Sequence, residues 1–94
     1  MPNPLISIII PVLNGEIFLD RCFATLDAQT YPNLEIIFID NGSTDSSVKM
    51  IKKYCSKKQK TQVLQCIKKG PAAARNTGLE LVTGDFLSFL DVDD

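Results

Sequence analysis

The stretch IIFIDNGSTDS, residues 36–46, joins an apolar run to a polar turn and to residues that favour the start of a helix. Its four apolar residues are mostly β-branched, and a run that is apolar on both faces is typical of a strand in a covered parallel sheet. Asp40–Gly42 has strong turn chemistry, and Ser43–Ser46 supplies N-cap residues. The stretch therefore predicts one strand–turn–helix unit of an α/β fold.

Further strands are predicted on both sides of this unit. Ile6–Val12 and Phe86–Leu90 are clear apolar runs, and Val63–Ile67 is a weaker one. Ile6–Val12 lies within an apolar stretch that lacks a basic flank, is broken by Pro11 and is too short to span a bilayer. A first strand explains it better than a signal peptide.

Helical spacing separates the predicted strands. The first helix ends before Tyr31–Pro32, because a residue that precedes proline resists the helical conformation. A third helix opens at Gly70–Pro71 and runs from Ala72 to about Val82, and Gly84 closes it. The residues expected to face inward are Leu19, Cys22, Phe23 and Leu26 in the first helix, Val48, Ile51 and Cys55 in the second, and Ala72, Asn76 and Leu79 in the third.

The resulting order is β-α-β-α-β-α-β, which predicts an α/β fold with an open parallel sheet and right-handed crossovers. Residues 1–94 contain no linker or repeat and are interpreted as a single unit. Because the last strand runs directly into clustered carboxylates, we expect this unit to be truncated.

Composition excludes several classes of protein. The chain has 94 residues and a net charge of −1, which does not favour nucleic-acid binding. Cys22, Cys55 and Cys66 form no CxxC pair and the chain has no histidine, so we expect reduced cysteines in a cytoplasmic protein and no zinc site. A dinucleotide-binding glycine fingerprint and a P-loop are both absent from the sequence.

Polar residues follow three of the predicted strands. They are Asn14–Glu16, Asp40–Gly42 and Asp91–Asp94. Ligands of open α/β sheets bind outside the carboxyl ends of the strands, so these groups are expected to converge on one rim. That convergence is the main indication of a functional site.

The carboxylates on this rim have two interpretations each. Asp91, Asp93 and Asp94 suit a hard divalent cation that bridges to phosphate oxygens, or they form a solvated acidic turn. Asp40 accepts hydrogen bonds from a ribose or a base, or it only forms the turn.

Basic residues add a third set of candidates. Arg75 and Asn76 lie in the third predicted helix and are placed to hold a phosphate or a carboxylate of a ligand, although Arg75 paired with a nearby carboxylate for structure is the alternative. A lysine-rich segment contains Lys52, Lys53, Lys57, Lys58, Lys60, Lys68 and Lys69. Such a segment is typical of a solvated helix face, and attraction to an anionic membrane surface is the more specific interpretation.

Together these pieces resemble glycosyltransferase family 2, whose catalytic domain has the GT-A fold. Four strings carry the resemblance, in this order and spacing: Ser7–Glu16 (SIIIPVLNGE), Ile39–Asp45 (IDNGSTD), Gly70–Gly78 (GPAAARNTG) and Thr83–Asp94 (TGDFLSFLDVDD). The match implies that the chain is the N-terminal, Rossmann-like half of a GT-A domain, which binds the nucleotide-sugar donor.

The resemblance also implies roles for individual residues. Asp91 and Asp93 form the DxD motif, which grips the ribose and, through Mn²⁺ or Mg²⁺, the diphosphate, and Asp94 is a further metal ligand in some relatives. Leu13 replaces an aromatic ring that many members have, and Asn41 replaces a second aspartate. The predicted donor-binding set is Pro11, Val12, Leu13, Asn14, Glu16, Asp40, Asn41, Arg75, Asp91 and Asp93.

The function that follows is an inverting transfer of a sugar from a nucleotide diphosphate, with a UDP-sugar favoured, to the hydroxyl of a saccharide or lipid-linked acceptor. Polysaccharide or glycolipid synthesis at the cytoplasmic face of a membrane is the expected setting. The general base of the family lies beyond its DxD motif, so no catalytic residue is assigned. A nucleotidyltransferase and a non-catalytic, metal-binding regulatory module are the alternatives.

Overall fold

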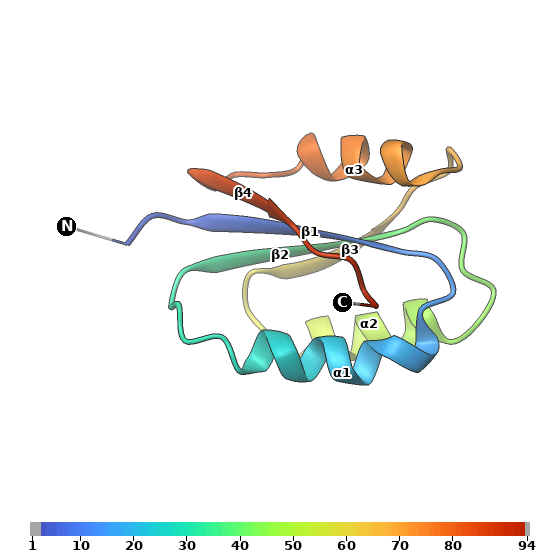
Figure 1. Ribbon diagram of the computed structural model, residues 1–94, viewed down its shortest axis with the longest axis horizontal. Coiled ribbons are helices and arrows are strands. Elements are labelled where there is room, and N and C mark those ends of the chain that lie inside the picture. The colour runs from blue at the N-terminus through green and yellow to red at the C-terminus, as the bar shows by residue number, and fades with distance from the viewer. Residues whose placement is uncertain (1–2, 94) are drawn as a thin grey trace.

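The computed structural model describes residues 3–93, which form seven elements in alternating order. All strands in this range join one parallel sheet in the order β3-β2-β1-β4, so the predicted α/β fold with an open parallel sheet is confirmed (Figure 1). The elements are β1 (Ile6–Val12), α1 (Glu16–Asp27), β2 (Leu34–Asp40), α2 (Ser47–Cys55), β3 (Thr61–Gln65), α3 (Pro71–Leu79) and β4 (Phe86–Phe89).

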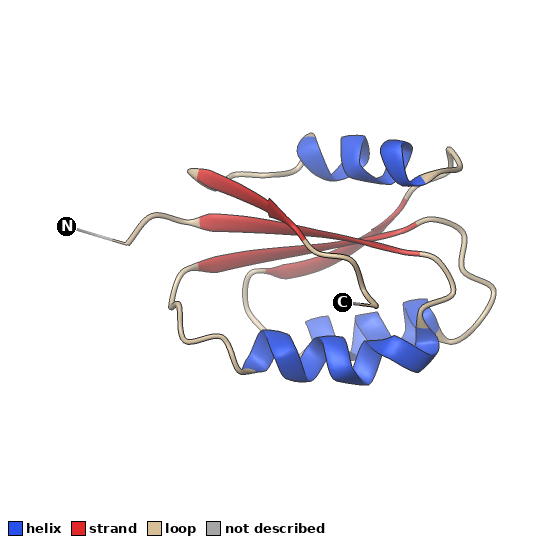
Figure 2. Cartoon of the chain, in the orientation of Figure 1, coloured by secondary structure: helices blue, strands red, loops and turns tan. Residues whose placement is uncertain are grey.

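The helices lie in two layers on opposite faces of the sheet. Helices α1 and α2 cover one face and α3 covers the other (Figures 1 and 2). The chain moves outward from β1 to β2 and β3, and then returns past β1 to β4. Because crossovers keep one hand, this change of direction moves the connecting helix to the other face. The reversal lies between β1 and β4, where open α/β sheets hold their ligands.

The two central strands divide their side chains between the two layers. Ile10 and Phe38 are fully buried against α1 and α2, whereas Ile9 and Ile37 are fully buried toward α3. Each such side chain contributes about 1.5–3 kcal/mol through burial. The expected double coverage therefore holds for β1 and β2, and these buried strands form the base of the rim.

Helix α3 differs from its prediction in length and in orientation. It ends at Leu79, three residues before Val82, and the predicted inward side chains of Ala72, Asn76 and Leu79 are all exposed. The buried residues are instead Ala74 and Gly78. Their small size lets the helix lie close to the sheet, and a Cβ atom added at Gly78 would come within 2.7 Å of the Ile9 side chain.

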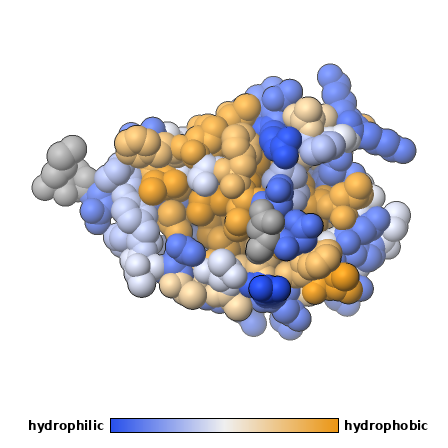
Figure 3. Space-filling model, in the orientation of Figure 1, coloured by the Kyte–Doolittle hydropathy of each residue, from blue (hydrophilic) through white to orange (hydrophobic). Residues whose placement is uncertain are grey.

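Strands β3 and β4 also differ from their predictions. Strand β3 begins and ends two residues before the predicted run Val63–Ile67, and the Ile67 side chain is 96% exposed. Strand β4 is an edge strand with both faces exposed, which contradicts the expected double coverage. Its phenylalanines Phe86 and Phe89 contribute to the exposed apolar surface, and Figure 3 shows apolar side chains gathered over the strands in this view.

Gly84 does not close a helix, as the sequence predicted, but holds β4 against β1. Its amide donates to the Ser7 hydroxyl (3.0 Å), which in turn donates to the Glu35 carboxylate (2.7 Å). The backbone and hydroxyl of Thr83 donate to the same carboxylate (3.0 and 2.8 Å). This network fixes the start of β4, and therefore the path of the chain toward Asp91.

Candidate functional site

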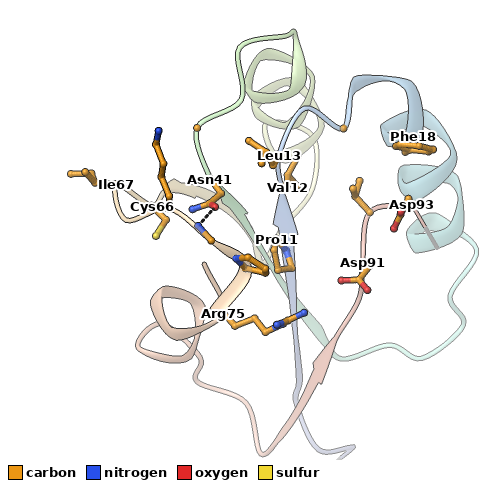
Figure 4. Close-up of a pocket in the computed structure, with 16 residues that line it drawn as sticks. Pro11, Val12, Leu13, Phe18, Asn41, Cys66, Ile67, Arg75, Asp91 and Asp93 are labelled. Atoms are coloured by element: carbon orange, nitrogen blue, oxygen red, sulfur yellow. Dashed lines mark hydrogen bonds between the residues drawn. The ribbon is translucent and has the colours of Figure 1, made fainter. Parts of the chain in front are cut away.

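A pocket of about 670 Å³ opens at the carboxyl ends of the strands. Its volume lies within the roughly 300–1,000 Å³ that small-molecule sites occupy. It brings together most of the predicted donor-binding residues, and Figure 4 shows their side chains around the pocket. The predicted residues that line it are Pro11, Val12, Leu13, Asn41, Arg75, Asp91 and Asp93.

The end of β1 and the start of α1 form an apolar wall of the pocket. Leu13 is 58% exposed and Phe18 is 38% exposed, although both are large apolar side chains. Pro11 has no amide hydrogen to leave unpaired at this position. Apolar side chains exposed on the wall of a pocket suit the flat faces of a planar ring.

Asp91 and Asp93 lie on the opposite side, in the turn that follows β4. Between them, Val92 is half-buried and packs against the core beneath α1 and α2. A Cβ atom added at Gly15 would come within 3.1 Å of Val92, so the β1–α1 loop closes over this anchor. With Val92 held inward, the two exposed carboxylates on either side of it are left at the pocket.

Basic groups line the third side of the pocket. Arg75 extends from α3 toward the side of Asp91 (Figure 4), and Lys69 lies in the loop before α3. Among residues 3–93, the one ion pair joins Lys58 to Asp27 (3.1 Å), so Arg75 is not tied to a carboxylate in that range. The pocket thus offers cationic side chains and carboxylates to the same ligand, which suits a phosphorylated group with a bound divalent cation.

Asn14 and Glu16 belong to the predicted set but do not line the pocket. Asn14 has a positive φ of 49°, and its side-chain oxygen accepts from the Thr44 amide (2.8 Å). The Glu16 carboxylate accepts from the Ser46 amide (3.2 Å), while the Glu16 amide donates to Asp45 (3.1 Å). These residues brace the loop after β1 against the loop after β2, and their side chains are used by that contact rather than by the pocket.

Helix α2 begins at Ser47 with Ser46 at its N-cap, within the predicted Ser43–Ser46, and the side chain that accepts from the start of the helix is that of Asp45. One Asp45 oxygen accepts from the Ser47 amide (2.9 Å) and the other accepts from Glu16. Ser46 occupies the N-cap position without a side-chain cap bond. The hydrogen bond with the Ser47 side chain, followed by the backbone amides of Ser47 and Glu16, outweighs desolvation and lowers the pKa of Asp45 below its ordinary value.

This shift predicts that acid weakens the rim. Because the folded-state pKa of Asp45 is below its unfolded value of about 3.9, its contribution is complete above that pH and is lost as the pH falls through the folded-state pKa. We expect Asp45→Asn to unfold at lower urea than wild type at pH 7, and the difference to shrink toward pH 3. A difference that is constant across this range would contradict the prediction. Glu35 and Asp27 add to the acid sensitivity: despite desolvation, hydrogen bonds from Thr83 and Ser7 lower the pKa of Glu35, and the hydrogen bond with Tyr54 lowers the pKa of Asp27.

Asp40 is 1% exposed and, like Asn14 and Glu16, is not among the residues that line the pocket. Its Oδ2 atom accepts from the amides of Gly42 (3.3 Å) and Ser43 (3.2 Å), which is the turn-forming role. Its Oδ1 atom is buried without a hydrogen-bond partner in residues 3–93. A buried, unpaired carboxylate oxygen is costly, and it is the kind of acceptor that a ligand's N–H or O–H group satisfies.

Several lining residues were not predicted from the sequence, and most of them lie in or next to the loop after β3: Phe18, Cys66, Ile67, Lys69, Gly70 and Pro71. A signal was available, because the loop after any parallel strand reaches the same rim. The predicted strand ended two residues too late and absorbed Ile67. Asp94, the third predicted metal ligand, lies outside the described residues.

The carboxylates are too few to bind a divalent cation by themselves, but they fit one that is also bound by the phosphate oxygens of a ligand. Within residues 3–93, no three Asp, Glu or Cys side chains gather as metal ligands. Mg²⁺ is commonly held by one or two carboxylates, with substrate phosphate oxygens and water completing the shell. Asp91 and Asp93 on one pocket wall match that donor set.

Comparison with known proteins places the chain in a family. The family model described as Glycosyl transferase family 2 matches residues 7–94, so the chain belongs to that family. An uncharacterized glycosyltransferase of Haemophilus influenzae is 45% identical over the whole chain, which spans 38% of that relative. The putative glycosyltransferase EpsH of Bacillus subtilis is 34% identical over the whole chain, which spans 27% of it.

Solved structures agree on the fold. S. aureus TarS, 31% identical, superposes with a TM-score of 0.88 over 96% of this chain and 28% of its own. The mannosyltransferase PcManGT from Pyrobaculum calidifontis, in complex with GDP-Man and Mn²⁺, has a TM-score of 0.89 over 99% of this chain and 28% of its own. At 23% identity the second likeness concerns the fold alone. The GT-A glycosyltransferase fold is therefore confirmed, and the chain spans well under half of each relative.

Proposed function

We propose that the protein binds the donor of a metal-dependent sugar transferase, which moves a sugar from a nucleoside diphosphate to an acceptor hydroxyl with inversion at the anomeric carbon. A UDP-sugar is the donor, and a saccharide or lipid-linked hydroxyl in polysaccharide or glycolipid synthesis is the acceptor. The observation that carries the proposal is the meeting of Asp91 and Asp93 with the end of β1 in one pocket.

The charge arrangement supports a diphosphate ligand. A nucleoside diphosphate is negatively charged and a divalent cation is positively charged. The cation would offset the repulsion between the diphosphate and the two carboxylates, and the arginine would attract the diphosphate directly. Asp93, with Asp91 nearby on the same wall, would hold the cation, and Arg75 from α3 would bind phosphate oxygens. When bound, Mn²⁺ or Mg²⁺ supplies neutralisation of the charge that develops on the diphosphate leaving group.

The choice of UDP is supported by likeness and by the pocket wall. TarS was solved in complex with UDP-GlcNAc. The match covers 95% of this chain, with 30% identity and a TM-score of 0.86. Leu13 and Pro11 offer apolar contact to a planar base, and the buried, unpaired oxygen of Asp40 at the end of β2 is the acceptor that a base reaching it would satisfy. A uracil ring presents one N–H donor, which matches a single free carboxylate oxygen.

A thermal-shift series with UDP, GDP, CDP and dTDP, each with and without Mn²⁺, tests the proposal. We expect UDP with Mn²⁺ to raise the Tm by roughly 10 °C at a concentration of about 100 Kd, because ligation then adds about 2.7 kcal/mol. A shift from Mn²⁺ that no nucleotide changes supports the regulatory-module alternative instead. Pyrophosphate release from a nucleoside triphosphate and a sugar phosphate supports the nucleotidyltransferase alternative.

The placement at a cytoplasmic membrane face rests on the lysines of α2. Every charged residue from 46 to 79 is basic, and Lys52 and Lys53 are exposed along α2. No helix in residues 3–93 has the length and hydropathy needed to cross a bilayer. An exposed basic helix is attracted to anionic lipid at about 1 kcal/mol per lysine.

Vesicle sedimentation tests this placement. We expect binding to vesicles that contain phosphatidylglycerol, and no binding to pure phosphatidylcholine. Lys52→Gln combined with Lys53→Gln should weaken binding about 30-fold at low salt, because two lysines contribute roughly 2 kcal/mol. Equal sedimentation of wild type and the double variant would exclude α2 as the contact.

A further inference from the structure

Both polar groups of the Asn41 side chain bond to one loop. Its Nδ2 atom donates to the Lys68 carbonyl (2.8 Å), and its Oδ1 atom accepts from the Gly70 amide (2.9 Å). The second bond is the dashed line beside Asn41 in Figure 4. An amide offers one donor group and one acceptor to this loop, so Asn41 clamps the two residues on either side of Lys69.

The clamped loop lies between β3 and α3 and has no regular structure. Cys66 is the first residue of this loop. Its amide donates to the Asp40 backbone carbonyl (2.8 Å), and its thiol donates to the Lys68 carbonyl (3.2 Å). Gly70 at its end has a φ of 109°, which favours glycine and turns the chain into α3. The two bonds of Asn41 add to these contacts and fix the backbone groups directly before and after Lys69.

Lys69 gives the clamp a functional consequence. It lines the pocket on the side of α3, yet its own side chain is exposed and bonded to no residue in the described range. A long, flexible cation binds a phosphate well only if its backbone is held in place, since ordering it costs conformational entropy. Fixing the backbone on both sides of Lys69 reduces that cost.

We infer that Asn41 is a positioning residue: it holds the loop 68–70 so that Lys69 reaches the phosphates of the bound nucleotide, and it does not itself contact the nucleotide. The part of this inference that concerns nucleotide affinity rests on the proposed function. An aspartate at this position would lack the donor and would place a carboxylate against the Lys68 carbonyl, so the amide is the form that this loop requires.

Hydrogen exchange tests the clamp without any ligand. We expect Asn41→Ala to speed exchange of the Gly70 amide about tenfold, because that amide loses its hydrogen-bond partner. Asn33→Ala is the matched control: it also removes an asparagine with two bonds, to Asn3 and Lys60, but at the other end of the sheet. Unchanged exchange at Gly70 in Asn41→Ala overturns the inference.

A double-mutant cycle with UDP and Mn²⁺ tests the route through Lys69. Asn41→Ala and Lys69→Ala should each weaken UDP binding about tenfold, the typical effect of a hydrogen bond to a charged group. If Asn41 acts through Lys69, the double variant binds no more weakly than Lys69→Ala alone. Losses that multiply show direct contact of Asn41 with the nucleotide and overturn the inference. Absence of UDP binding by wild type refutes the proposed function, while Gly70 exchange still decides whether Asn41 holds the loop.

Discussion

Replacing Gly84 with alanine should separate β4 from β1 and lower the free energy of unfolding by about 3 kcal/mol, the upper part of the range for overpacking. A Cβ atom at this position would come within 2.5 Å of the Ser7 hydroxyl and 2.8 Å of the Leu5 carbonyl. No rotamer relieves a contact with the backbone. The strand must therefore move, which weakens the bonds from Asp85 and Phe86 to Leu5 (2.7 and 3.2 Å).

Urea unfolding of Gly84→Ala checks this expectation, with Ser88→Ala as the control. Ser88 lies on the same strand and is exposed, so its hydroxyl is removed without crowding β1. We expect the control to stay within about 0.5 kcal/mol of wild type, as surface substitutions do. Wild-type stability in Gly84→Ala would show that the start of β4 shifts freely. The polar network of Ser7, Glu35 and Thr83 would then not set the position of the strand.

The fold was predictable where burial alone decides it. The runs around Ile9 and Ile37 are apolar on both faces, and they became the two central strands with helices on each side. Helix α3 was harder, because its contact face consists of Ala74 and Gly78, which carry little hydrophobic signal. Its close fit depends on the space above Ile9, and that distance is a property of the assembled sheet rather than of local spacing.

The candidate site was predictable in position but only partly in its members. Parallel strands bring their carboxyl ends to one rim, so Asp91 could be placed there from strand order alone. The separate uses of Asn41 and Asn14 could not, since both are polar residues in turns. Their hydrogen bonds connect segments about 30 residues apart, through loops whose conformations follow no periodic pattern.

Removing the Asp93 carboxylate should abolish the metal-dependent part of nucleotide binding. In Asp93→Asn we expect UDP affinity in Mn²⁺ to fall at least ~100-fold, equivalent to about 2.7 kcal/mol. The reason is that a divalent cation between diphosphate and protein loses a charged partner. Without Mn²⁺, wild type and variant should bind UDP equally weakly. Asp20→Asn is the control, since it makes the same charge change on an exposed part of α1 away from the pocket.

Asp91→Asn should behave differently and so separate the two carboxylates. Asp91 lies on the pocket wall toward Arg75, whereas Asp93 lies beside Phe18 (Figure 4). If Asp91 accepts a hydrogen bond from the ribose, its loss weakens UDP binding by a similar factor with and without Mn²⁺. Isothermal titration in both conditions measures each factor. If Asp93→Asn keeps the full Mn²⁺-dependent affinity for UDP, the metal assignment is contradicted. If Asp91→Asn loses UDP affinity only when Mn²⁺ is present, both carboxylates are metal ligands.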